Sequence, residues 1–268
     1  MEVSALSSLI ITDRQKDLVF YKINRPDKRN SLNQELVREF KENLDSIYYD
    51  NSIKVVVITG IGKAFCAGAD LAYLEKLSHF SDSENLEDSQ DLSDLFKKIY
   101  EMPKLTIAMV NGPAIAGGCG LALTCDFIFA DKENAKFGFS EVRIGFIPAI
   151  VMNFLIRKVS LNNAYKLVIG AEIIQPEEAF QLGFVDEIME SDKLNNYTFN
   201  FIDNILTQNS FAAMMQTKKL FQRLLDIPLS DGIQIASEIN AQSRKSADCQ
   251  TGLKSFLNKQ KVDWRKSK

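Results

Sequence analysis

Histidine and cysteine are scarce in this 268-residue sequence, which contains one histidine and four cysteines. The cysteines form no CxxC pair, and a single histidine cannot complete a zinc site with them. No histidine stands near Cys66 or Cys119 in the sequence, so we interpret both as small buried thiols rather than nucleophiles. A dinucleotide-binding fingerprint is missing as well, so neither a metal nor a redox cofactor is expected.

Long apolar runs and runs of basic residues are also missing. No apolar segment reaches the length that crosses a membrane, and the N-terminus lacks a basic segment followed by an apolar one. The formal charge is −3 and no basic cluster stands out, so a nucleic-acid partner is not expected. These features predict a protein of the reducing cytoplasm without membrane or nucleic-acid partners.

Apolar residues make up 46% of the chain, enough for a large core, and no Gly-, Pro- or Ser-rich linker interrupts it. Strand-like and helix-like segments alternate, which predicts α/β architecture. Strands are expected at 18–23, 53–59, 105–110, 127–130, 136–139 and 184–188. Helices are expected from Asn33 to residue 47, at 71–77, 92–102, 162–170 and 174–183, and through most of 191–261. The polar, acidic segment 78–90 is expected to be a solvated, mobile loop, and Ser140 to cap a helical turn.

Two glycine-rich loops each connect a strand-like run to a helix. The first loop, 60–71, follows the apolar run 55–58. The second follows the run 105–110, breaks it at Gly112-Pro113, and leads at Gly117-Gly118 into a small-residue helix. Glycine lets another backbone or a ligand come close, and a helix N-terminus offers unpaired N–H groups. The two loops can therefore place two backbone donors on one oxygen, although paired glycines alone also fit tight packing of a helix on a sheet.

Further motifs stand in register with these loops. They are Asn24-Arg25-Pro26, Asn30-Ser31-Leu32-Asn33, Phe65-Cys66-Ala67-Gly68-Ala69-Asp70-Leu71, Val110-Asn111-Gly112, Ala116-Gly117-Gly118-Cys119, Cys125-Asp126, Phe137-Gly138-Phe139-Ser140-Glu141 and Gly145-Phe146-Ile147-Pro148. In their order and spacing they resemble the crotonase (enoyl-CoA hydratase/isomerase) superfamily. The resemblance implies a crotonase-like spiral of β-β-α units in residues 1–190. It also implies a helical C-terminal oligomerisation region in residues 191–268, part of the same fold, and a homotrimer or hexamer.

The resemblance further implies an acyl-CoA or acyl-carrier thioester as the substrate, so that coenzyme A enters only as part of the substrate. It assigns the binding of the thioester oxygen to the N–H groups of Ala69 and Gly117. The other positions that it assigns to substrate binding are Arg29, Ala67, Gly68, Asp70, Leu71, Gly118 and Gly120. Asp70 is also expected to cap the helix that follows the first loop.

Acidic residues decide the chemistry that the resemblance implies. Hydratases of the superfamily carry two glutamates, and the second of them corresponds to Glu141, which is therefore the expected catalytic acid and base. The first corresponds to Gly120, so that carboxylate is missing here. Burial beside Phe139, Ile144 and Phe146 is expected to raise the pKa of Glu141. Without the resemblance, the same glutamate would be interpreted as an exposed acid at a helix start.

Three functions fit these residues. The first is an enoyl-CoA hydratase or dehydratase in which Glu141 alone handles the protons. The second is a Δ3,Δ2-enoyl-CoA isomerase, which only moves a proton between two carbons and needs one carboxylate. The third is a non-catalytic subunit that binds acyl thioesters. Among these three functions we favour the hydratase, because of its pocket segment Glu141-Val142-Arg143-Ile144-Gly145-Phe146-Ile147-Pro148.

Overall fold

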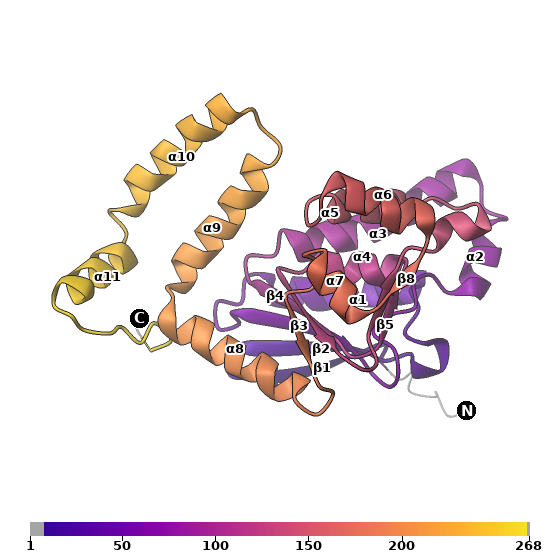
Figure 1. The fold of residues 1–268 in the computed structure, drawn as a ribbon, viewed down its shortest axis with the longest axis horizontal. Helices are drawn as coiled ribbons and strands as arrows, with labels where there is room; N and C mark the ends of the chain where they lie inside the picture. Colours follow the sequence, from indigo (N-terminus) through magenta and orange to yellow (C-terminus); the bar gives the residue numbers. More distant parts are fainter. Residues whose placement is uncertain (1–7, 267–268) are drawn as a thin grey trace. The chain divides into compact units, whose positions relative to one another are not determined.

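The computed structural model describes residues 8–266 (Figure 1). The chain divides between Tyr197 and Thr198 into two compact units. Within residues 8–197, a six-stranded sheet has the order β1-β2-β3-β4-β6-β9. Its strands are β1 (Ile10–Gln15), β2 (Leu18–Ile23), β3 (Val55–Gly60), β4 (Leu105–Val110), β6 (Phe127–Asp131) and β9 (Glu187–Met189). β1 is antiparallel to β2, and the other neighbours are parallel. A smaller sheet joins β5 (Pro113–Ile115), β7 (Lys136–Gly138) and β8 (Ile173–Ile174) in that order.

The central strands are apolar at most positions because both faces of the sheet are covered. Every residue of β3 and of β4 is buried. Parallel strands with two covered faces are continuous apolar runs rather than alternating ones. The predicted strands at 18–23 and 105–110 are confirmed with their bounds.

The helices of this unit are α1 (Gln34–Tyr48), α2 (Leu71–Leu77), α3 (Asp82–Tyr100), α4 (Gly117–Leu123), α5 (Ala149–Leu155), α6 (Leu161–Gly170) and α7 (Pro176–Gln181), with 3-10 turns η1 (Pro26–Lys28) and η2 (Glu141–Ile144). The first helix begins as predicted, because the Asn33 side chain accepts the N–H of Leu36 at 3.0 Å. Its apolar stripe is buried as expected: Leu36, Val37, Phe40, Leu44 and Ile47.

The acidic segment 78–90 is mostly helical, and the prediction of a mobile loop is wrong. α3 starts there with a capping box, in which Ser81 Oγ accepts the N–H of Glu84 at 3.3 Å and the Glu84 carboxylate accepts the N–H of Ser81 at 2.8 Å. Acidic side chains in a first turn are favoured by the helix dipole. The acids that suggested a loop therefore begin a helix, which buries Phe96 on its other face.

The last strand of the large sheet also differs from the prediction, because β9 begins at Glu187 and not at Phe184. Gly183 has a φ of 89° after α7. The N–H groups of Phe184 and Val185 both donate to the carbonyl of Ala179 at 3.3 Å, which folds them back onto α7. They cannot pair with β6, so the pairing starts only where Glu187 lies opposite Phe129.

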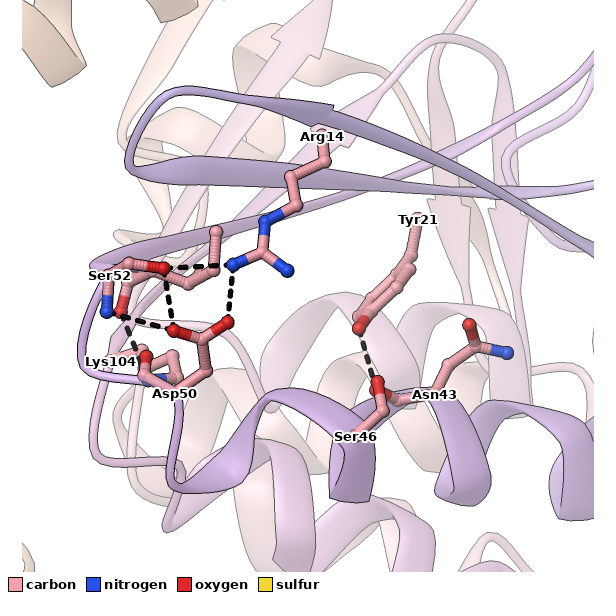
Figure 2. A network of polar contacts seen from close by, with 8 residues as sticks. Arg14, Tyr21, Asn43, Ser46, Asp50, Ser52 and Lys104 are labelled. Carbon is pink, nitrogen blue, oxygen red and sulfur yellow. Dashed lines mark hydrogen bonds and ion pairs between the residues drawn. The ribbon is translucent and has the colours of Figure 1, made fainter.

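A polar network fixes the end of the large sheet at which β3 and β4 begin (Figure 2). Arg14 of β1 forms an ion pair with Asp50 and donates to Ser52 Oγ at 2.8 Å. Lys104, only 3% exposed, donates from Nζ to the carbonyls of Asp50 and Ile53 at 2.9 and 3.0 Å. Burial lowers the pKa of this lysine. The network holds the turn between α1 and β3 at the end of these strands opposite the two glycine-rich loops.

From Thr198 onward the chain is helical, as predicted. α8 (Leu194–Gln208) is followed by α9 (Phe211–Leu224), α10 (Leu229–Ser243) and α11 (Ala247–Leu257). The tail after α11 returns to α8, where the N–H of Trp264 donates to Thr207 O at 2.9 Å. Among the helices of residues 8–266, none has the length and apolar character that crossing a membrane demands. The division into residues 1–190 and 191–268 as parts of one fold stays a prediction.

Candidate active site

Main-chain hydrogen bonds join the two glycine-rich loops to each other and to β7. The N–H of Cys66 donates to Pro113 O at 3.2 Å, and the N–H of Ile115 donates back to Cys66 O at 3.0 Å. Pro113 and Ile115 belong to β5, which pairs on its other side with β7, and the N–H of Ala116 donates to Gly138 O at 2.7 Å. We call this arrangement of Cys66, β5 and β7 the backbone ladder. It brings the start of α4 beside the first loop and beside the segment that leads into η2.

Two glycines are needed where the loops touch. A Cβ on Gly118 would lie 2.0 Å from the carbonyl oxygen of Cys66. Gly68 has a φ of 86°, and a Cβ there would lie 2.9 Å from Ile115 O and 3.5 Å from the nitrogen of Gly117. Neither position has room for a side chain, so the glycines permit the close approach of the two loops.

The N–H groups of Ala69 and Gly117 lie at this junction. Leu32 forms hydrogen bonds with the backbone groups on either side of Ala69. Its N–H donates to Gly68 O at 2.7 Å, and its carbonyl accepts the N–H of Asp70 at 2.9 Å. Since N–H directions alternate along an extended segment, the N–H of Ala69 points away from Leu32. Gly117 is the first residue of α4 and has no intrahelical acceptor. Neither group finds an acceptor within the described residues, so both stay the predicted donors to a substrate oxygen.

The residue before α4 has a strained backbone. Ala116 has a φ of 52° and a ψ of −122°, which a residue with a Cβ rarely adopts. Such a conformation costs about 1–3 kcal/mol and persists only where the surroundings enforce it. Here the bond from Ala116 N–H to Gly138 O enforces it, and the peptide of Gly117 is turned accordingly.

Glu141 is a buried acid beside α4. It is 8% exposed and is the first residue of η2. Its Oε2 has no hydrogen-bond partner among the residues that the structure describes. Burial raises the pKa of Glu141, although a contact with its own N–H opposes the shift. Burial and the charge of Glu141 both raise the pKa of Cys119, which places the carboxylate near that thiol of α4.

The surroundings of Glu141 differ in part from the prediction. Phe139 is buried, but Ile144 and Phe146 are 68% and 54% exposed rather than packed in the interior. Ser140 precedes the turn as expected, yet its side chain makes no cap. Its φ of −96° and ψ of 5° are not the extended geometry that lets an N-cap hydroxyl reach the first turn.

The raised pKa of Glu141 predicts how stability depends on pH. The folded protein holds this proton more tightly than the unfolded chain, so the free energy of unfolding falls as pH rises from below 4.5 through the folded pKa. Glu141→Gln lacks this loss and is expected to be more stable than the wild type at pH 7. Urea unfolding from pH 4 to pH 7 measures the difference between the two proteins. A constant difference across that range contradicts the burial of an ionised carboxylate.

The cysteines of the two loops behave as the sequence predicts. Cys66 and Cys119 are free and buried. Burial raises the pKa of the Cys66 thiol to about 12 and raises that of Cys119 as well. Thiols of this kind stay protonated at neutral pH and are poor nucleophiles. Within residues 8–266 no group of three or more His, Cys, Asp and Glu side chains could hold a metal ion.

Comparisons with known proteins agree with this architecture. The family model described as enoyl-CoA hydratase/isomerase matches residues 13–267. This chain belongs to that family. A Thermus thermophilus protein, named provisionally as an enoyl-CoA hydratase, is 38% identical over 88% of this chain and 93% of its own length. The 2,3-dehydroadipyl-CoA hydratase of Escherichia coli is 31% identical over 96% of this chain and 99% of its own.

A solved structure shows the same relationship in three dimensions. The crystal structure from Legionella pneumophila, described provisionally as an enoyl-CoA hydratase/isomerase (crotonase), matches with a TM-score of 0.86 and 34% identity. The match covers 96% of this chain and 99% of that chain. The predicted crotonase fold with a helical C-terminal region is therefore confirmed.

In this family member Gly120 stands where the resemblance places a first glutamate, and the structure leaves no room for a side chain there. A Cβ on Gly120 would lie 2.2 Å from Val151 Cγ1 and 2.9 Å from Phe96 Cε2. Val151 belongs to α5 and Phe96 to α3, and both are buried. The missing carboxylate has thus been replaced by packed apolar side chains rather than by an open space.

Gly120→Ala is expected to lower the free energy of unfolding by about 1–3 kcal/mol, because overpacking a core costs that much. Helix propensity alone would favour alanine by up to about 1 kcal/mol. Urea denaturation measures the change, and the loss should shrink in a Val151→Ala background. Gly170→Ala is the matched control, since a Cβ there meets only Glu172 Cγ at 3.8 Å. An equal, small effect at both glycines would contradict the packing described here.

The remaining predicted binding positions lie around the first loop. The N–H of Ala67 donates to Arg29 O at 3.0 Å, and the Arg29 side chain is exposed. Leu71 is the first residue of α2. Asp70 caps that helix as predicted, because its Oδ1 accepts the N–H of Ala72 at 3.1 Å. Roles of these residues in binding stay predictions.

One residue beside the loop has no role in the sequence prediction. Arg25 forms an ion pair with Asp70 across 2.8 Å, although 45 positions separate the two residues in the sequence. The only local signal is the motif Asn24-Arg25-Pro26, which places a polar turn there but names no partner.

Proposed function

We propose that this protein is an enoyl-CoA hydratase or dehydratase that binds an acyl thioester at the junction of its two loops. The N–H groups of Ala69 and Gly117 hold the thioester oxygen, and Glu141 is the only acid and base. The observation that carries the proposal is the buried Glu141 carboxylate, with its unpartnered Oε2, close to the helix whose first N–H is a free donor.

The proposed hydration follows from these groups. Two N–H donors stabilise the negative charge that develops on the thioester oxygen when water adds to the β-carbon of a 2-enoyl thioester. Glu141, as the carboxylate, takes a proton from that water, and the protonated acid gives a proton to the α-carbon. One C–O bond and one C–H bond form, the C=C π-bond is lost, and Glu141 returns to its starting state. Its raised pKa brings it closer to the value that suits both transfers.

The relatives support hydration, whereas Gly120 favours isomerisation as the second candidate. Two of the matched proteins are named 2,3-dehydroadipyl-CoA hydratase and crotonyl-CoA hydratase. An isomerase moves one proton between the α- and γ-carbons and never holds a water, so it has no use for a carboxylate at position 120. Apolar side chains at that place, Val151 and Phe96, suit such a reaction.

Other parts of the proposal rest on the family resemblance. The enzyme needs no cofactor besides the coenzyme A or carrier group of its substrate, and it forms a homotrimer or hexamer. Exposed large apolar side chains on the helical unit support self-association, because monomeric proteins rarely expose large apolar patches. They are Phe221, Leu225, Leu229, Ile233, Leu253, Phe256 and Leu257.

A paired turnover assay tests the proposal. One reaction contains a short 2-enoyl-CoA and follows the loss of the conjugated thioester absorbance. The other contains the matching 3-enoyl-CoA, and chromatography separates the 2-enoyl-CoA from the 3-hydroxyacyl-CoA that each activity would produce. Both reactions are repeated with Glu141→Gln.

Each outcome of the assay selects one function. Formation of 3-hydroxyacyl-CoA from the 2-enoyl-CoA, lost in Glu141→Gln, supports the hydratase. Conversion of the 3-enoyl-CoA without any hydration makes the protein an isomerase. No turnover in either reaction, for acyl chains from short to long and for carrier-bound thioesters, would leave a subunit that only binds acyl thioesters.

A further inference from the structure

Arg25 and Asp70 form an ion pair that is shielded from solvent. Arg25 Nη2 lies 2.8 Å from Asp70 Oδ2, and the two side chains are only 13% and 11% exposed. The guanidinium also donates from Nη1 to the carbonyl of Ser31. Such a desolvated, multiply bonded pair is held in one geometry, unlike a pair at the surface.

Arg25 is itself anchored to the first loop through Asn30. The N–H of Arg25 donates to Asn30 Oδ1 at 2.9 Å. Asn30 is fully buried, and its Nδ2 donates to the carbonyls of Ile61 and Ala64 at 2.9 and 2.7 Å. The backbone of Arg25 is therefore fixed to the same loop that carries Asp70, and its guanidinium reaches Asp70 from there.

Asp70 is the residue immediately after Ala69, whose N–H is a proposed donor to the thioester oxygen. Its N–H is bound by Leu32 O at 2.9 Å, its Oδ1 caps α2 through Ala72 at 3.1 Å, and its Oδ2 is held by Arg25. Every polar group of Asp70 that faces its neighbours is thus engaged. The peptide of Ala69 is fixed on its C-terminal side by three contacts of one residue.

The helix that follows provides little support of its own. In α2 the side chains from Ala72 to Leu77 are half-buried or exposed, and none of these six is buried in the core. A hydrogen bond from Tyr73 OH to Asp88 ties it to α3. The cap at Asp70, together with the arginine that holds it, consequently decides where the helix begins.

We infer that Arg25 and Asp70 are positioning residues that orient the N–H of Ala69 toward the thioester oxygen. The inference rests on the proposed function, because it requires that oxygen to bind at Ala69. The pair contacts no reacting atom. It acts by fixing the direction of one backbone donor, and misplacing such a donor weakens the polarisation of the bound carbonyl more than it weakens binding.

A chromophoric thioester measures this effect directly. Bound 4-dimethylaminocinnamoyl-CoA shifts its absorbance to longer wavelength when its carbonyl is polarised. Asp70→Asn keeps the shape and a capping oxygen but loses the charge that holds Arg25, and Arg25→Met removes the partner. We expect each variant to lose at least half of the red shift and to lower kcat by about 10–100-fold, while KM changes less than threefold. The double variant should be no worse than Asp70→Asn, because the two residues act through one contact.

Arg14→Met is the matched control. It breaks another Arg–Asp ion pair, that of Arg14 and Asp50, at the end of the large sheet where β3 and β4 begin. We expect its red shift and kcat to equal those of the wild type, whatever its melting temperature. Circular dichroism checks that each variant is folded. If Arg25→Met does not fold, Asp70→Asn carries the test, since it preserves the cap.

The outcomes separate this inference from the proposed function. No red shift in the wild type overturns the proposed oxyanion site and the inference with it. A red shift in the wild type that both variants retain, with unchanged kcat, overturns the inference alone and makes the pair a structural contact like that of Arg14. A red shift that falls together with kcat in both variants, but not in the control, supports the positioning role.

Discussion

Glu141→Gln is expected to lower kcat by about 10²–10⁴-fold, the contribution of a general acid and base to such a reaction. Glutamine fills the same space beside α4 but neither accepts nor gives up a proton. Because Gly120 provides no second carboxylate, no neighbouring group of the proposed site can take over the transfer. Steady-state kinetics with the substrate identified by the paired assay measures the loss, and KM should change little because the thioester oxygen is bound elsewhere.

Glu35→Gln is the control for this experiment. Glu35 is an exposed acid in the first turn of α1, where its charge interacts with the helix dipole. Its replacement should leave kcat unchanged. If Glu141→Gln retains more than a tenth of the activity, Glu141 is not the base, and both the hydratase and the isomerase mechanisms proposed here are wrong.

Gly117→Pro is expected to lower kcat/KM by about 10²–10³-fold, because it deletes one of the two proposed oxyanion donors. Proline is well tolerated at the first position of a helix, where the N–H has no intrahelical acceptor. The red shift of the chromophoric thioester should disappear with the activity. Circular dichroism and a thermal melt show whether the start of α4 is intact.

Gly117→Ala separates the loss of the donor from the added bulk. A Cβ at this position would meet Leu32 Cδ1 at 3.2 Å, the end of a side chain that can move by a few tenths of an ångström. Alanine keeps the N–H, so this variant should retain most of the activity. Equal activity of the alanine and proline variants would mean that the N–H of Gly117 does not bind the thioester oxygen.

Much of the fold could be predicted because its signals are local. The apolar run 105–110 is a buried strand that pairs in parallel with a strand on each side. The stripe from Leu36 to Ile47 repeats at helical spacing and faces the core. Gly117 begins α4 as expected, since the change from an apolar strand to small residues marks a new element.

The failures and omissions have different causes. The acidic segment before residue 90 has the polarity of a loop, but Ser81 and Glu84 form a capping box, a local helix-start signal that the prediction missed. The exposure of Ile144 and Phe146 depends on how η2 leaves the sheet, which no spacing reveals. The ion pair of Arg25 with Asp70 joins separate loops, so neither residue indicates its partner.

The sequence could indicate which segments form the proposed site, but not how its interior is packed. Motifs with fixed order placed Ala69, Gly117 and Glu141 in one region, and the backbone ladder joins their three segments. That Gly120 is a glycine is visible in the sequence. That Val151 and Phe96 fill the space above it depends on how α5 and α3 pack, which is known only from the structure.

The backbone ladder also determines where a ligand would restrict motion. Its amides at Cys66, Ile115 and Ala116 are already bonded to main-chain oxygens in the free protein. Such groups are released only when a cooperative unit of the fold opens, whereas α2, whose side chains from Ala72 to Leu77 are half-buried or exposed, opens more easily. Under the proposed function, the entropic cost of binding therefore falls on α2 and on the acyl chain, while the backbone ladder is preorganised before any ligand arrives.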